Sequence, residues 1–100
     1  MTTETADVLA RHGNVAVVQL SGRKFPGITI QGDSFSYLAG LAKSVAARAA
    51  QMGDADLDDA ASELRERLEG ILQVYETPLS EHGIPLPYVR SAPPASDSQS

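Results

Sequence analysis

Residues 23–34, RKFPGITIQGDS, constrain the fold of this chain more than any other stretch. The Phe-Pro-Gly segment at 25–27 predicts a turn. Proline fixes its own φ and favours an extended residue before it, and the following glycine can adopt positive φ. Residues 28–31 then alternate apolar and polar side chains, as in a half-buried strand. Asp33 and Ser34 are good helix N-caps, so a helix is expected to begin directly after them.

The junction between this strand and this helix has two interpretations. A helix N-terminus presents unpaired N–H groups and can bind an anion. However, a single Gly-Asp-Ser is far short of a phosphate-binding fingerprint, and capping alone accounts for these residue types. No catalytic residue, metal ligand or cofactor is predicted. The candidate ligand-binding residues are Arg23, Phe25, Gln31, Asp33 and Ser34, with His82 or Tyr88 arriving from the C-terminal end.

Residues 14–20, NVAVVQL, form the clearest predicted strand. Both of its faces are mostly apolar, which implies cover on both sides. The connection at 21–27 suits a wide antiparallel loop rather than a two-residue turn. Its adjacent Arg23 and Lys24 are either a solvated loop tip or a contact for an acidic partner. Phe25 is expected to anchor the loop to the core.

The N-terminal residues are ambiguous. Residues 5–11 could form two helical turns ended by Gly13, although a helix this short is marginal unless it docks onto something. We therefore expect residues 1–12 to be a flexible or short helical N-terminus. The first thirteen residues lack the basic start and apolar core of a signal peptide.

Residues 35–52 are expected to form a helix that Gly53 ends. Its apolar positions fall on one stripe, which we expect to face the core. The stripe consists of Leu38, Leu41, Ala42, Val45, Ala49 and Met52. A second helix is expected to begin in the acidic segment 54–59, with Asp56 as its N-cap. A calcium loop is excluded there, because the segment lacks the central glycine and the length of an EF-hand loop.

The second helix has a long run of apolar positions at spacings of three and four. These are Leu57, Ala61, Leu64, Leu68, Ile71, Leu72, Tyr75 and Leu79. The pairs Glu63–Arg67 and Arg65–Glu69 are expected to form i,i+4 ion pairs on its outer face. The apolar length favours a helix-mediated homodimer, and the alternative is simple packing against the first helix. The predicted partner interface consists of Leu64, Leu68, Ile71, Tyr75, Leu86 and Tyr88.

Pro78 should end or kink this helix near residues 76–77. Gly83 followed by Ile84 resembles a Schellman stop. Residues 85–89 are then expected to be extended and to lie in a groove, either of the same chain or of a partner. Residues 91–100 have the composition of a disordered tail.

The composition excludes several classes of protein. The chain has 100 residues, 42% of them hydrophobic, which fits one small domain with a limited core. It contains no cysteine, which excludes disulfides, thiol catalysis and cysteine-bound zinc and fits a cytoplasmic protein. The net charge of −5 disfavours binding to nucleic acid or to an anionic membrane. No apolar run is long enough to span a bilayer.

Three segments carry a resemblance: RKFPG at 23–27, QGDS at 31–34 and HGIPLPYV at 82–89. They resemble the Arg-x-Phe-Pro-Gly, Gln-Gly-Asp-Ser and His-Gly-Ile-x-Leu-Pro-Tyr-Val segments of a family of small uncharacterised bacterial proteins, of the actinobacterial type. The resemblance covers roughly residues 14–90. It implies a bacterial, cytoplasmic protein and attaches no activity to it.

We therefore expect an α+β fold, in which an antiparallel β-hairpin is followed by an antiparallel helical hairpin (ββαα). A four-stranded sheet across a dimer would stabilise the β-hairpin. Residues 13–90 are expected to form the single domain.

The expected function is that of a small non-enzymatic binding or adaptor protein. It would be an accessory or immunity-type protein that acts as a homodimer and also binds a larger protein partner. The alternative is a small-molecule-binding protein or enzyme with a site around Asp33 and Ser34. A flat apolar patch on the second helix would favour the first reading, and a cleft joining Arg23, Asp33 and His82 would favour the second.

Overall fold

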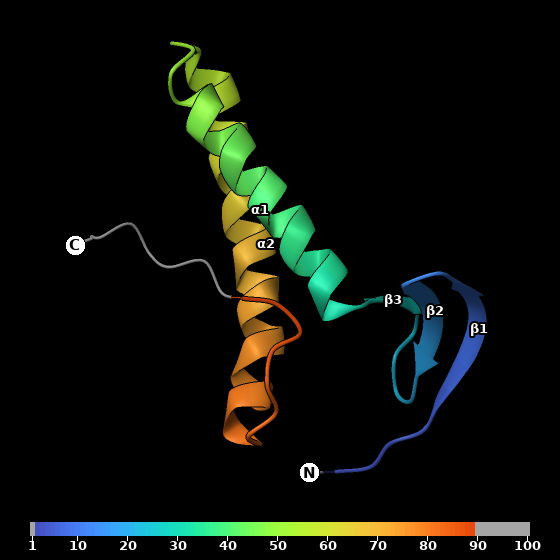
Figure 1. Ribbon diagram of the computed structural model, residues 1–100. Helices are drawn as coiled ribbons and strands as arrows, with labels where there is room; N and C mark the ends of the chain where they lie inside the picture. The colour runs from blue at the N-terminus through green and yellow to red at the C-terminus, as the bar shows by residue number, and fades with distance from the viewer. Residues whose placement is uncertain (1, 90–100) are drawn as a thin grey trace.

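A computed structural model describes residues 2–89 of the chain and shows an α+β fold (Figure 1). The predicted fold class is therefore confirmed, with one strand more than expected. A three-stranded antiparallel sheet comes first, and a helical hairpin follows it. The expected tail at 91–100 lies outside the described residues. The elements are β1 (Ala6–His12), β2 (Val15–Leu20), β3 (Gly27–Ile30), α1 (Gly32–Ala49) and α2 (Ala55–Glu81).

The additional strand is β1, so the helical interpretation of residues 5–11 is wrong. In the sheet order β1-β2-β3, β1 pairs with β2 from Ala6 opposite Leu20 to His12 opposite Val15. Hydrogen bonding to β2 along the whole strand stabilises this segment more than two isolated helical turns would. The sequence signal that could have found it is the Gly-Asn pair at 13–14 between two apolar runs, a two-residue hairpin turn.

Both helix starts differ from the prediction by a few residues. Helix α1 begins at Gly32 with Gln31 at the N-cap position, so Asp33 lies in the first turn instead of capping it. Helix α2 is capped by Asp54 rather than Asp56. The Asp54 carboxylate accepts a hydrogen bond from the Leu57 N–H at 3.1 Å. Acidic residues suit both the N-cap and the first turn, so composition alone does not choose between them.

The helices meet along a seam of small side chains. Seven of the described residues are buried, and none has a large apolar side chain. The predicted stripe on α1 is therefore wrong for its large members, Leu38, Leu41, Val45 and Met52, which are about half exposed or more. Alanines let two helix axes approach closely and push larger neighbours to the side. The seven buried residues are Gly32, Ala39, Ala42, Ala46, Ala49, Ala61 and Glu76.

Helix α2 continues through Pro78 to Glu81, so of the two expectations for residues 76–77 the helix end is wrong, and the kink stays a prediction. A proline inside a helix removes one N–H bond, here to the carbonyl of Val74, whose side chain is largely exposed. The predicted Schellman stop is confirmed. The Ile84 N–H donates to the Leu79 carbonyl at 2.8 Å, and Gly83 has a φ of 67°.

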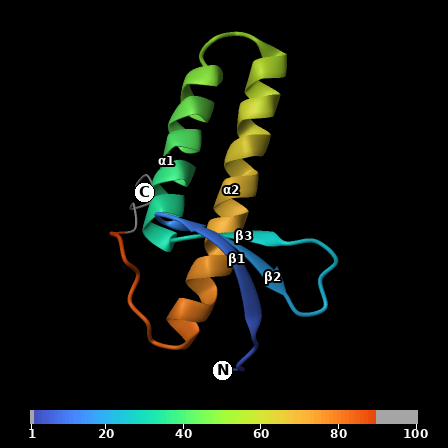
Figure 2. The same ribbon diagram turned by 90° about the vertical axis from the view of Figure 1, so that its right-hand side faces the viewer.

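The sheet stands beside the lower part of the hairpin and leaves the upper part uncovered (Figures 1 and 2). Phe25 is 72% exposed, so the expectation that it anchors the loop to the core is wrong. The reason is that no layer covers the β2–β3 loop among the described residues. On α2, both predicted ion pairs are confirmed, Glu63–Arg67 at 2.8 Å and Arg65–Glu69 at 3.8 Å.

Candidate functional site

The strand-to-helix junction is tied to the turn between β1 and β2. The Asn14 side-chain amide donates to the Ser34 hydroxyl at 2.8 Å, and the Gln31 N–H donates to the Asn14 carbonyl at 3.0 Å. The Asp33 carboxylate accepts the Ser34 N–H at 2.8 Å. These bonds fix where α1 starts relative to the sheet, which is a structural role.

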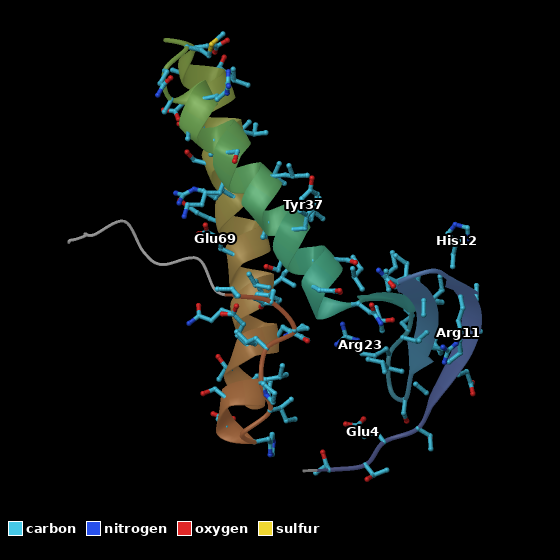
Figure 3. The ribbon with its side chains drawn as sticks, viewed as in Figure 1. Glu4, Arg11, His12, Arg23, Tyr37 and Glu69 are labelled. Carbon is cyan, nitrogen blue, oxygen red and sulfur yellow. The ribbon has the colours of Figure 1, made fainter. Side chains whose placement is uncertain are left out.

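The other two candidate ligand residues lie elsewhere. Arg23 and Phe25 are on the β2–β3 loop, where Figure 3 labels Arg23. The Lys24 Nζ lies 5.5 Å from the centroid of the Phe25 ring. The hollow beside this loop is lined by residues between Leu20 and Gly27, and neither Asp33 nor His82 contributes to it. The Gln19 side chain holds the loop by donating to the Arg23 carbonyl at 2.7 Å. The structure therefore does not bring the five candidate residues into one cleft.

One side of the helical hairpin, which we name the closed flank, is polar and partly covered. It holds a hollow of about 330 Å³. Glu69, one of its lining residues, lies on α2 (Figure 3). The Tyr88 hydroxyl donates to the Glu76 carboxylate at 2.7 Å, so the C-terminal segment docks on its own chain. Glu76 is only 8% exposed. The lining residues are Ser36, Ala39, Gly40, Lys43, Glu69, Leu72, Gln73, Glu76 and Tyr88.

The opposite side, which we name the open flank, is apolar and uncovered in the single chain. Its side chains are between 42% and 70% exposed. They are Leu38, Leu41, Val45 and Met52 of α1 and Leu57, Leu64 and Ile71 of α2. Three of these on each helix recur every seven residues, which keeps them on one side of a helix.

The register of the hairpin aligns the two sets of the open flank. Ala46 and Ala49 pack against Ala61, which fixes the heights of the two helices relative to each other. Residues at equal distances along the chain from the hairpin tip then lie at about the same height. Met52 is level with Leu57, Val45 with Leu64, and Leu38 with Ile71. The open flank is therefore a ladder of large apolar pairs beside an alanine seam.

A third feature is an apolar groove of about 390 Å³ between β3 and the middle of α2. None of its lining residues is charged. The groove ends at Gly32, where the Tyr75 ring lies so close that a Cβ on the glycine would overlap it. The lining residues are Ile28, Thr29, Ile30, Gly32, Phe35, Ile71, Val74 and Tyr75.

The predicted interface residues are divided among these surfaces. Leu64 and Ile71 belong to the open flank, while Leu68 and Tyr75 are half-buried. Leu86 and Tyr88 lie on the C-terminal segment, whose Tyr88 reaches the closed flank. Sequence reasoning missed the four large residues of α1 because it placed them in the core. The signal that could have found them is the separate three-and-four spacing of alanines 39, 42, 46 and 49.

The described residues were also compared with the requirements of a metal site and of a membrane-spanning helix. Within residues 2–89, no group of three or more histidine, aspartate or glutamate side chains is arranged to hold a metal ion. No described helix is both long and apolar enough to cross a membrane.

The comparisons with known proteins give one match. The model of a family described as "Family of unknown function (DUF6959)" matches residues 1–88. No curated protein and no solved structure matches the chain. The resemblance to an uncharacterised family is confirmed to that extent.

Proposed function

This chain belongs to DUF6959, a family of unknown function, and we propose that it is a non-enzymatic protein-binding protein that acts as a homodimer through its open flank. Its role would be that of an adaptor or accessory protein, of which an immunity-type protein is one kind. The observation that carries the proposal is the distribution of apolar side chains. Alanines fill the seam between the helices, while the leucines, valine and methionine beside it are exposed.

The exposed area is of the size that association requires. Seven half-exposed side chains at about 100 Å² each offer roughly 700 Å², close to the ~800 Å² per partner of a standard interface. A chain of this length also gains little from its own core when the buried side chains are almost all alanine. Burial of the open flank would supply the missing apolar contacts.

The geometry of the open flank suits a second copy. The same patch must face itself across a two-fold axis, and a ladder of equal apolar pairs meets that condition without matching charges. Two hairpins packed in this way form a four-helix bundle with a seven-residue repeat at its centre. The heptad positions Leu38, Val45, Leu57 and Leu64 would interlock with those of the partner.

A sheet shared across the dimer is the other arrangement that the sequence suggests. With β1 present, such a sheet would have six strands rather than the four expected. We prefer the open flank because it offers more apolar side chains than the four-residue β3.

The alternative function, a ligand site around Asp33 and Ser34, gains no support from the junction. The Ser34 hydroxyl accepts from Asn14, and the Asp33 carboxylate accepts from the Ser34 N–H. The wider setting that we infer is a bacterial cytoplasm. The three motif segments support this, as does the absence of cysteine.

The test is the mass of the full chain in solution, measured by size exclusion with light scattering. We expect twice the 10.6 kDa of one chain. Leu64→Glu should yield the single-chain mass, because it places a charge in the apolar ladder at a side chain already half exposed in the monomer. Gln73→Glu, on the closed flank of the same helix, is the matched control and should leave the dimer intact. A wild-type monomer at high concentration, or a dimeric Leu64→Glu with helical content retained, would overturn the proposal.

A further inference from the structure

The two edge strands of the sheet differ in how well they are protected against pairing with another strand. The outer strand β1 has an irregular register between Val8 and Ala10 and bears Asp7 and Arg11. Bulges and charges are the means by which proteins block pairing at an exposed edge. The other edge, β3, has the sequence GITI and pairs with β2 in regular register, with no charge in the strand. One edge of this sheet is protected and the other is open.

The hydrogen-bond pattern shows which groups the open edge presents. In an antiparallel pair, successive residues face the neighbouring strand and the free side in turn. The Gln31 N–H bonds the Asn14 carbonyl of the β1–β2 turn, so Thr29 and Gly27 also face β2. Ile28 and Ile30 therefore direct their N–H and C=O groups away from β2, toward the free edge.

The open edge of β3 adjoins the apolar groove described above. The groove is lined by β3 on one side and by Ile71, Val74 and Tyr75 of α2 on the other. Because the groove lies between a strand edge and a helix, a single added strand can pair with one wall and pack against the other. An edge-to-edge dimer instead needs an edge without a facing wall, because each strand brings its own sheet. The uncharged lining requires an uncharged occupant.

We propose that β3 and α2 bind an extended, uncharged segment of a different protein, which adds to the sheet as a fourth strand. The backbone groups of Ile28 and Ile30 would hydrogen-bond the segment, and alternate apolar side chains of the segment would contact Ile71 and Val74. This deepens the proposed protein-binding function by stating the chemistry of the partner segment. The open flank and this edge then have different occupants, which would meet at Ile71, the residue that belongs to both surfaces.

The test uses a capped seven-residue peptide of alternating threonine and valine and the full chain labelled for NMR. A peptide with proline in place of the central valine is the control, because proline cannot complete the strand hydrogen bonds. We expect the alternating peptide to slow hydrogen exchange of the Ile28 and Ile30 amides by about tenfold or more. The Thr29 amide, already paired with β2, should change little. Absence of slowing at about 1 mM peptide, or equal slowing by the proline peptide, would overturn the proposal.

Two pairs of variants locate the binding. Ile28→Pro removes an outward N–H and should abolish peptide binding with the sheet intact, whereas Thr29→Pro removes an inward N–H and should damage the sheet itself. Val74→Lys places a charge in the groove and should abolish binding. Val89→Lys is its matched control, since Val89 is 95% exposed and does not line the groove. Retained binding in Ile28→Pro or in Val74→Lys would contradict the assignment.

The readout also separates this proposal from the dimer. Protection of the Ile28 and Ile30 amides that rises with protein concentration, without peptide, would show a second copy at the edge and overturn the proposal. Leu64→Glu should still bind the peptide, because Leu64 does not line the groove. If the chain is monomeric but still binds the peptide, the homodimer proposal is wrong and the strand-edge proposal stands.

Discussion

The two flanks lie on opposite sides of the same helical hairpin and differ in polarity and in how far the chain covers them. The closed flank is polar, and the chain's own C-terminal segment covers part of it through the Tyr88–Glu76 hydrogen bond. The open flank carries seven large apolar side chains that are about half exposed or more, and Ile71 among them faces β3 across the apolar groove. Both flanks adjoin the same alanine seam.

The contrast between the flanks indicates which contacts stabilise the single chain. Small residues at the seam set the distance between the helices, and the Tyr88–Glu76 hydrogen bond helps to hold the C-terminal segment. The large side chains, which form the core of most proteins, are here half-buried at best within one chain. The comparison therefore predicts that small or polar residues matter most to the monomer, and that large residues of the open flank matter most to association.

The greatest loss in the free energy of unfolding is expected for a substitution at Gly32, at the lower end of the seam. Gly32→Ala would force its Cβ into the Tyr75 ring, and we expect a loss of about 2–3 kcal/mol in the free energy of unfolding. Gly40→Ala is the matched control, because a Cβ there meets no atom within 4 Å. That control should raise stability by up to about 1 kcal/mol through helix propensity. Urea denaturation followed by circular dichroism measures both. A Gly32→Ala variant as stable as the wild type would contradict the importance of small residues to the monomer.

An intermediate effect is expected at the contact that covers the closed flank. Tyr88→Phe removes a hydrogen bond to a buried carboxyl group and should lower the free energy of unfolding by about 1.5 kcal/mol. Residues 85–89 should then exchange their amide hydrogens faster. Tyr37→Phe, at a largely exposed tyrosine on α1, is the control and should change stability by less than about 0.5 kcal/mol. Equal effects of the two substitutions would show that the closed flank is not held by this bond.

The smallest effect on the monomer is expected on the open flank. Val45→Ala removes a side chain that is about half exposed, and the better helix propensity of alanine offsets part of the loss, so the net change at low concentration should be near zero. Its neighbour Ala46 lies in the seam, and Ala46→Val should cost about 1–3 kcal/mol through overpacking. Denaturation in dilute protein compares the two. A loss of 2 kcal/mol or more at Val45, as for a buried valine, would mean that the open flank is covered within the single chain.

Features that depend on near neighbours in the sequence were predictable. The α+β class, the two helices, the Schellman stop at Gly83 and the Glu63–Arg67 pair all follow from turn chemistry and from contacts within a few residues. The candidate ligand residues were less predictable as a group. Whether Arg23 meets Asp33 depends on how the sheet sits against the helices, which no local pattern contains.

The pattern of residues along the chain is enough to indicate strands followed by two amphipathic helices. Which apolar stripe of α1 turns inward depends on tertiary packing. Leu38 and Ala39 belong to stripes of equal periodicity, and the alanine stripe packs because it allows the closest approach of α2. That choice left the larger side chains on the open flank. Tertiary pairing likewise made residues 6–12 a strand, because the hydrogen bonds that stabilise it come from β2 rather than from the segment itself.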